Sequence, residues 1–242
     1  MKKIKKQKNK FRSGNIYKFD FMRRLFRRSL GKMGCAFVPV LLFALLLTGC
    51  ESSTSHLADG HDFGDNNPIV YVAFGDSITY GTGISGQYSY PTVLASMMMR
   101  SVINYGMPGA ESFVGASKVH QVLRDYKPGF LLILFGVNDL IMGYGEEEAI
   151  GNLHYICQAA IDNKTIPVIA TLTPVAREHR IWASSVDRLN ALIRQMASDM
   201  NVALVDLDAA FNWNPELLQG DGLHPNALGY NLMAVTFYDV VN

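Results

Sequence analysis

The chain has 242 residues, 49% of them hydrophobic, and a formal net charge of +1. Its length and composition suit one globular domain with a sizeable core. The charge is unevenly distributed: residues 1–34 hold 13 of the 22 basic residues and one of the 21 acidic ones, which leaves 9 basic and 20 acidic residues elsewhere. An acidic body lacks the basic face that binding to phosphates requires, so we expect no nucleic-acid partner.

The basic N-terminal segment is followed by an uninterrupted apolar run at residues 35–47. A basic arm can bind nucleic acid, but a basic stretch before a short apolar run is typical of a secretory signal. The run is too short to span a bilayer, which takes about 20 residues. The run ends at Leu47 and is followed by Thr48, Gly49 and Cys50, so a cysteine stands three positions after its end.

This ending resembles the lipobox of bacterial lipoproteins, in which a cysteine is lipidated and becomes the mature N-terminus. The resemblance implies a signal peptide at residues 1–49, lipidation of Cys50, and an extracytoplasmic protein anchored to a bacterial membrane. An ordinary secretory signal with an incidental cysteine is the alternative. Because signal peptides usually have about 15–30 residues, translation starting at Met22 is a further hypothesis. Cys157 lies in an apolar helical stretch and is expected to be a buried, inert thiol.

Residues 50–67 are mostly polar and have no apolar period, which predicts a flexible tether before a domain at residues 68–242. Within that domain, short apolar runs alternate with helical patterns. The alternation predicts a parallel sheet with helices on both faces. Strands are expected at residues 69–74, 101–104, 130–135, 166–171 and 202–205, and helices at 90–99, 112–125, 146–162, 184–200 and 226–241.

Small and polar residues follow the first three predicted strands. Ser77 comes after the first strand, Gly106 and Gly109 after the second, and Asn138 after the third. Ligands bind at the carboxyl ends of strands in such sheets, where these residues could supply a nucleophile, a backbone N–H and a side-chain amide. Taken singly, each is also an ordinary turn or cap residue.

Asp221 and His224 lie three positions apart, just before the last predicted helix. At this spacing the carboxylate can orient the imidazole, which leaves the second ring nitrogen for the hydroxyl of Ser77. A serine, a histidine and an aspartate are the groups that nucleophilic acyl transfer needs. A plain surface turn made by Asp-Gly and His-Pro is the alternative.

The four blocks, in this order and after these strands, resemble the SGNH (GDSL-type) hydrolases over nearly all of residues 68–242. Their layout is most similar to the bacterial thioesterase I/lysophospholipase L1/arylesterase group. The resemblance implies a three-layer α/β/α flavodoxin-like fold with a five-stranded parallel sheet. It implies that Ser77 is the nucleophile, that His224 is the general base and then acid, and that Asp221 orients His224.

The same resemblance implies an oxyanion hole made by the N–H of Ser77, the N–H of Gly109 and the side chain of Asn138. Gly109 is preferred to Gly106 because it matches the second glycine of the Asn-x-Gly-x-x-Gly stretch, and Gly106 stays the alternative. Ile78 replaces the leucine of the eponymous motif, which is a common apolar exchange.

Two other motifs, a dinucleotide-binding fingerprint and the nucleophile elbow of α/β-hydrolases, match the sequence only in part. Residues 81–86 fit Gly-x-Gly-x-x-Gly, but a dinucleotide fingerprint directly follows its strand, and this stretch begins six residues later. We therefore expect a loop on the rim of the site. Thr79 stands where the nucleophile elbow Gly-x-Ser-x-Gly has its last glycine.

No cluster of His, Cys, Asp or Glu residues has the spacing of metal ligands, and neither a metal nor an organic cofactor is expected.

These observations predict a serine esterase that acts through an acyl-enzyme, as a membrane-anchored and monomeric lipoprotein. The substrate is either acetylated carbohydrate or a lysophospholipid or acyl (thio)ester. A catalytically silent, ligand-binding lipoprotein of the same fold is the alternative function.

Overall fold

The computed structural model describes residues 56–242, which contain a five-stranded parallel sheet in the order β2-β1-β3-β4-β5. The predicted sheet is confirmed, and the ends of its strands lie within two residues of the expected ones. The strands are β1 (Asn67–Gly75), β2 (Ser101–Gly106), β3 (Pro128–Leu134), β4 (Ile166–Ala170) and β5 (Ala203–Val205).

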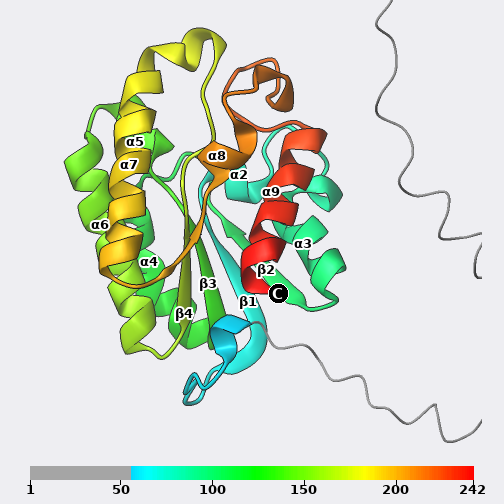
Figure 1. Cartoon of the computed structure of the whole chain (residues 1–242), viewed down its shortest axis with the longest axis vertical. Coiled ribbons are helices and arrows are strands. Elements are labelled where there is room, and N and C mark those ends of the chain that lie inside the picture. Colours follow the sequence, from blue (N-terminus) through cyan, green and yellow to red (C-terminus); the bar gives the residue numbers. More distant parts are fainter. Residues whose placement is uncertain (1–55) are drawn as a thin grey trace, which may run out of the picture. The chain divides into compact units, whose positions relative to one another are not determined.

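Helices cover both faces of the sheet, as Figure 1 shows. One layer consists of α4 (Ser112–Tyr126), α6 (Glu146–Asp162) and α7 (Ala183–Asp199), and the other consists of α3 (Tyr90–Met98) and α9 (Ala227–Val241). The predicted three-layer α/β/α fold is therefore confirmed. Strands β3 and β4 are buried at every position, which explains why their sequences are continuous apolar runs without alternation.

Three short helices were not predicted: α2 (Ser77–Tyr80), α5 (Val137–Met142) and α8 (Leu207–Phe211). Each follows the carboxyl end of a strand, toward the top of Figure 1. Helices of four to six residues are too short to show an apolar period, so only tertiary contacts reveal them.

The strand register brings the segments after the strands to the same level. Gly75, the last residue of β1, pairs with Gly106 in β2 and with Leu134 in β3. The chain therefore leaves three neighbouring strands at one edge, where a ligand site is expected in a parallel sheet.

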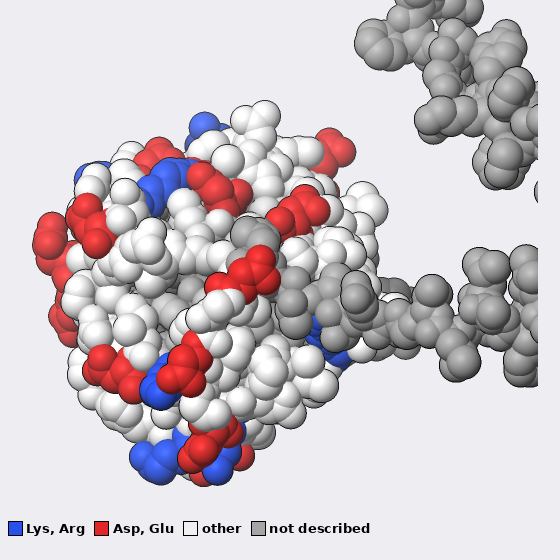
Figure 2. All heavy atoms as spheres, turned by 60° about the horizontal axis from the view of Figure 1, so that its bottom comes forward, with Lys and Arg blue, Asp and Glu red and all other residues white. Residues whose placement is uncertain are grey.

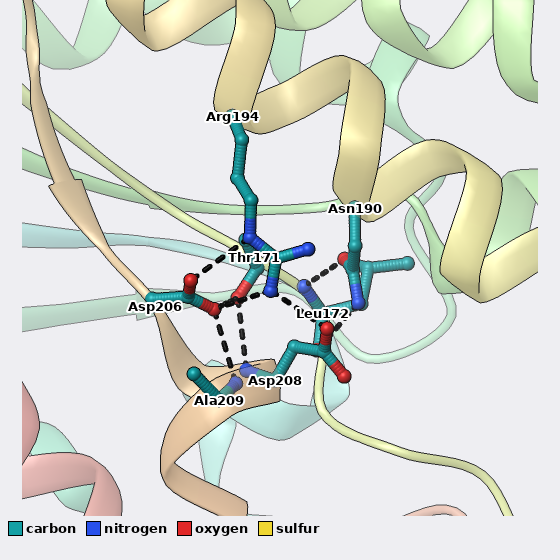
Figure 3. A network of polar contacts seen from close by, with 7 residues as sticks. All are labelled: Thr171, Leu172, Asn190, Arg194, Asp206, Asp208 and Ala209. Atoms are coloured by element: carbon teal, nitrogen blue, oxygen red, sulfur yellow. Dashed lines mark hydrogen bonds and ion pairs between the residues drawn. The ribbon is translucent and has the colours of Figure 1, made fainter. Parts of the chain in front are cut away.

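A polar network holds the loops after β4 and β5, as Figure 3 shows. Arg194 on α7 donates to both carboxylate oxygens of Asp206 and to Asp208, at 2.7–2.8 Å. Asn190, one turn earlier on α7, bonds the backbone N–H and carbonyl of Leu172 at 2.7 and 3.2 Å. One helix therefore fixes two loops at the carboxyl edge of the sheet.

The second half of the predicted tether packs against the domain, so a tether at residues 50–67 is wrong for residues 56–67. Leu57 and Phe63 pack against the core. Asp62 forms an ion pair with Lys164, at 2.5 Å, and His61 bonds the carbonyl of that lysine. Two isolated apolar residues give no sequence period, and the contacts of this segment are made by residues far along the chain, such as Phe130 and Lys164.

The predicted signal at residues 1–49, the start at Met22 and the lipidated Cys50 lie outside the described residues. Within residues 56–242, no helix is long and apolar enough to cross a membrane. Cys157 is fully buried and free, as predicted, and burial raises the pKa of its thiol to about 12.

Charged side chains are spread over the face that Figure 2 shows. Acidic side chains lie at many places on this face, with basic ones close beside several of them. The view contains no continuous basic area of the kind that nucleic-acid binding requires.

Candidate functional site

Ser77 is the first residue of α2 and lies two positions after the end of β1. Asp76 caps this helix, because its Oδ1 accepts the N–H of Ile78 at 2.8 Å. The preceding Gly75 has no room for a side chain, since a Cβ would overlap Thr79 and the carbonyl of Leu134. The tight strand-to-helix connection presents Ser77 at the carboxyl edge, where it is 7% exposed.

Asp221 and His224 lie in a loop between η4 (Pro215–Leu217) and α9. The N–H of Gln219 donates to the carbonyl of His224 at 2.7 Å, which closes the loop on itself. Gly222 has a φ of +71°, and a Cβ there would overlap the carbonyl of Ala176. The Asp-Gly pair is therefore a turn, and this turn holds both side chains at the sheet edge.

The three side chains form a chain of hydrogen bonds. Asp221 Oδ2 lies 2.7 Å from His224 Nδ1, and His224 Nε2 lies 2.9 Å from Ser77 Oγ. A carboxylate can only accept, so Nδ1 carries the proton and Nε2 of the neutral ring accepts from the serine hydroxyl. Hydroxyl, imidazole and carboxylate thus stand in the order that activates a serine nucleophile.

The electrostatics of Asp221 suit a carboxylate that stays ionised. Partial burial acts to raise its pKa, but the hydrogen bonds from Leu223 N–H, the His224 ring and His224 N–H outweigh it and lower the pKa. The carbonyl of Asp221 also accepts from Nδ1 of His179, at 2.9 Å. His179 was not singled out in the sequence, because a lone histidine in a loop gives no signal.

Asn138 lies in α5, and its amide points toward the segments that follow β1 and β2. Its Nδ2 donates to the carbonyl of Ala110 at 2.9 Å and to Asp76 Oδ2 at 3.4 Å. The structure therefore brings Asn138 next to the residue that precedes Ser77. The sequence placed it correctly after β3, but did not predict these two acceptors.

The two candidate glycines after β2 differ in their surroundings. Gly106 is packed so closely that a Cβ would overlap the backbone of Tyr80, and its N–H donates to Asn104 Oδ1 at 3.0 Å. Gly109 has a φ of +79°, and a Cβ there would meet nothing within 4 Å. No acceptor within residues 56–242 takes the N–H of Gly109.

A buried contact between Asp139 and Ser112 joins the segments that carry Asn138 and Gly109. Asp139 accepts the N–H of Ser112 at 2.9 Å and its hydroxyl at 2.5 Å. Burial raises the pKa of Asp139, although both of these hydrogen bonds act to lower it. The sequence analysis assigned no role to this pair, because the two residues are 27 positions apart and only the fold brings them together.

Asp76 is buried in a polar cluster behind Ser77. It is 1% exposed, and burial, aided by the nearby Asp139, raises its pKa to about 7. Burial also raises the pKa values of Tyr90 and Tyr230. The hydroxyl of Tyr90 forms a hydrogen bond with Thr79 Oγ1 at 3.3 Å, whereas the hydroxyl of Tyr230 has no hydrogen-bond partner among the described residues.

The loop after α2 is joined to the loop that carries His224. Gly81 ends α2, and Nε2 of Gln219 donates to the carbonyl of Thr82 at 2.8 Å.

Two aromatic residues in and after α8 differ in burial. Phe211 belongs to the core, and Trp213 is 39% exposed. Among the described residues, no group of three or more His, Cys, Asp or Glu side chains could hold a metal ion.

Comparisons with known proteins agree with this geometry. The model of the GDSL-like lipase/acylhydrolase family matches residues 73–232. The chain is 26% identical over 162 residues to thioesterase 1/protease 1/lysophospholipase L1 of Escherichia coli K12, covering 64% of this chain and 74% of the relative. It is 22% identical over 193 residues to an arylesterase of Vibrio mimicus, covering 77% and 90%.

A solved structure shares the fold. It is a lipolytic protein of the G-D-S-L family from Desulfitobacterium hafniense DCB-2, with a TM-score of 0.65 and 22% sequence identity. The similarity covers 72% of this chain and 99% of that protein. The match of the family model to residues 73–232 confirms the predicted resemblance to GDSL-type hydrolases.

Proposed function

Because this chain belongs to the GDSL-like lipase/acylhydrolase family, we propose that it hydrolyses carboxylic esters through an acyl-enzyme formed on Ser77. The observation that carries the proposal is the hydrogen-bond chain from Asp221 through His224 to Ser77, with links of 2.7 and 2.9 Å. All three side chains lie at the carboxyl edge of a parallel sheet, where α/β folds bind their ligands.

In the proposed mechanism, the Oγ of Ser77 attacks the ester carbonyl while Nε2 of His224 takes the hydroxyl proton. His224 then gives that proton to the leaving alcohol, and an acyl-enzyme remains. Water then attacks the acyl-enzyme while Nε2 of His224 takes its proton, and His224 returns this proton to Oγ of Ser77 as the acid leaves. Asp221 keeps the ring in the tautomer that leaves Nε2 free, and it stabilises the imidazolium that forms transiently.

The oxyanion formed in both steps needs hydrogen-bond donors. We propose the N–H groups of Ser77 and Gly109 and the amide of Asn138. The surroundings of the two glycines support Gly109 over Gly106, because the N–H of Gly106 already donates to Asn104. An open Cβ position at Gly109 is also consistent with a backbone that a substrate approaches closely.

Labelling by a fluorophosphonate probe tests the mechanism, because the probe reacts with an activated serine. Wild-type protein should react with the probe and hydrolyse p-nitrophenyl acetate, and Ser77→Ala should lose both properties. Ser117→Ala removes an exposed hydroxyl on α4 and should keep both. A Ser77→Ala protein that hydrolyses the ester as fast as wild type would refute the mechanism. Absence of labelling and hydrolysis in wild type would favour the silent binding lipoprotein.

The proposed location is the outer side of a bacterial membrane, through lipid on Cys50. Its support is the order of basic segment, apolar run and cysteine in the sequence. Radiolabelled palmitate should enter wild-type protein and the Cys35→Ser variant, and should not enter Cys50→Ser. Equal labelling of the Cys50→Ser variant would contradict the lipoprotein proposal.

That the protein is a monomer also stays a prediction.

Two substrate classes are compatible with this site. The E. coli relative is named as a thioesterase and lysophospholipase, which supports acyl substrates. The packing of residues 56–67 supports acetylated carbohydrate instead. These residues contact Lys164, which lies just before the amino end of β4. Ser77 follows the carboxyl end of β1, at the opposite edge of the sheet. Only residues 51–55 separate Cys50, the proposed lipidation site, from this packed segment.

We favour esters presented away from the anchoring membrane, and therefore acetylated carbohydrate. A series of p-nitrophenyl esters from acetyl to palmitoyl, measured beside acetylated xylose and chitin oligomers, tests this choice. A sharp preference for acetyl groups on sugars is expected. A preference for chains of eight or more carbons would contradict it and favour the lipid substrates.

A further inference from the structure

Asp76 directly precedes Ser77, and its two carboxyl oxygens have different partners. Oδ1 accepts the N–H of Ile78 at 2.8 Å and thereby caps α2. Oδ2 faces α5, where Nδ2 of Asn138 lies 3.4 Å away. The carboxyl group is 1% exposed, so this contact is shielded from water.

Nδ2 of Asn138, which carries two N–H groups, has two acceptors in this structure. It lies 2.9 Å from the carbonyl oxygen of Ala110 and 3.4 Å from Asp76 Oδ2. If Asn138 donates to an oxyanion during catalysis, its weaker contact, the one to Asp76, has to give way. The strength of that contact therefore determines how readily Asn138 reaches the oxyanion.

That strength depends on the charge of Asp76. A carboxylate accepts hydrogen bonds about twice as strongly as a neutral group, and it also repels a second negative charge that develops nearby. A neutral carboxylic acid avoids both effects. Its proton would be on Oδ2, since Oδ1 accepts the N–H of Ile78.

The surroundings of Asp76 favour the neutral form at moderate pH. Burial is the largest effect and raises the pKa to about 7; Asp139 on α5 raises it further, and the N–H groups of Ile78 and Thr79 oppose the shift. The other titratable groups that interact with it are Tyr90 on α3 and Tyr230 on α9. His224 is bonded to the adjacent Ser77.

We propose that Asp76 is a positioning residue for the oxyanion donor: as a neutral acid it releases the second N–H of Asn138 to the developing oxyanion, and as a carboxylate it holds that N–H back. The proposal rests on the esterase function of Ser77. It adds a protonation step that lies outside the hydrogen-bond chain from Asp221 to Ser77.

The proposal predicts a decline of kcat at alkaline pH. With a carboxyl that titrates near pH 7, the neutral fraction decreases about tenfold per pH unit above the midpoint. We expect the kcat of the full-length protein on p-nitrophenyl acetate to decrease at least fivefold between pH 7 and pH 9. KM should change less than twofold, because the Asn138 contact acts in the transition state.

The pH profiles of two variants separate this role from a merely structural one. Asp76→Asn cannot ionise, so its kcat should vary less than twofold between pH 7 and 9, whatever its absolute level. Asn138→Ala lacks the amide through which Asp76 acts, so its profile should also lose the alkaline decline, at a kcat lowered about 100-fold. Ser117→Ala should keep the wild-type profile.

The outcomes are distinct. A flat wild-type profile, or an alkaline decline that persists in Asn138→Ala, would overturn the role of Asp76. If Asp76→Asn does not fold, as judged by circular dichroism, the comparison of wild type with Asn138→Ala still decides. Ser77→Ala serves as the blank for spontaneous hydrolysis, and retention of enzymatic turnover in it would refute the proposed function instead.

Discussion

Nε2 of His224 lies 2.9 Å from Oγ of Ser77, although 147 positions separate the two residues in the chain. The contact joins the segment after the first strand of the sheet to the loop before its last helix. Its length is that of a formed hydrogen bond. The fold therefore brings the imidazole of His224 within hydrogen-bonding distance of the hydroxyl of Ser77.

Replacing Asp221 by asparagine should lower kcat by about 10³–10⁴-fold, because the amide can hold the His224 ring in the wrong tautomer. The fold should persist, since the amide oxygen can still accept the N–H groups of Leu223 and His224. Steady-state kinetics and the thermal midpoint measure the two effects. Asp187→Asn, an exposed change on α7, is the matched control. A decrease of less than tenfold in kcat would contradict the orienting role of Asp221.

Alanine should be tolerated differently at the two glycines after β2. Gly106→Ala places a Cβ against the backbone of Tyr80, and we expect a loss of about 3 kcal/mol in the free energy of unfolding. Gly109→Ala meets no atoms within 4 Å but adopts a positive φ, which costs about 1 kcal/mol. Urea unfolding measures both losses, and equal midpoints for the two variants would contradict the described packing.

The Arg194 network should stabilise the fold most at neutral pH. Hydrogen bonding to Arg194 is the main cause that lowers the pKa of Asp206, so its carboxylate contributes stability above its ordinary pKa and loses it as the pH falls through the lowered value. We expect Arg194→Met to lower the free energy of unfolding by about 2 kcal/mol at pH 7. The difference from wild type should shrink at pH 2.5–3.

A matched control for this change is available on the same helix. Arg188 pairs with Glu146, but its side chain is 61% exposed. Arg188→Met should therefore change stability by less than about 0.5 kcal/mol. If Arg188→Met destabilises as much as Arg194→Met, or if the Arg194→Met difference grows in acid, the network does not act as described.

The segment before β1 should contribute to stability. A chain that begins at residue 56 should unfold at the same urea concentration as the full-length protein. A chain that begins at residue 68 should be about 2–3 kcal/mol less stable, because it lacks the packing of Leu57 and Phe63. Identical midpoints for the chains that begin at residues 56 and 68 would show that residues 56–67 behave as the tether that the sequence predicts.

The sequence by itself determined the order and type of the long elements and which residues are candidates for the site. The helical period of 3.6 residues and continuous apolar runs are local signals, so the sheet and the long helices could be predicted to within a few residues. The rule that ligands bind at the carboxyl ends of parallel strands then placed Ser77, Asn138 and His224 at one edge.

Only the tertiary structure decided which groups touch and how they are charged. The different surroundings of Gly106 and Gly109 depend on Tyr80 and Asn104, and the packing of residues 56–67 depends on a surface about 100 residues away in the chain. The raised pKa of Asp76 depends on burial behind Ser77 and on the distance to Asp139. Burial and electrostatics are properties of distances in space, which local sequence patterns do not contain.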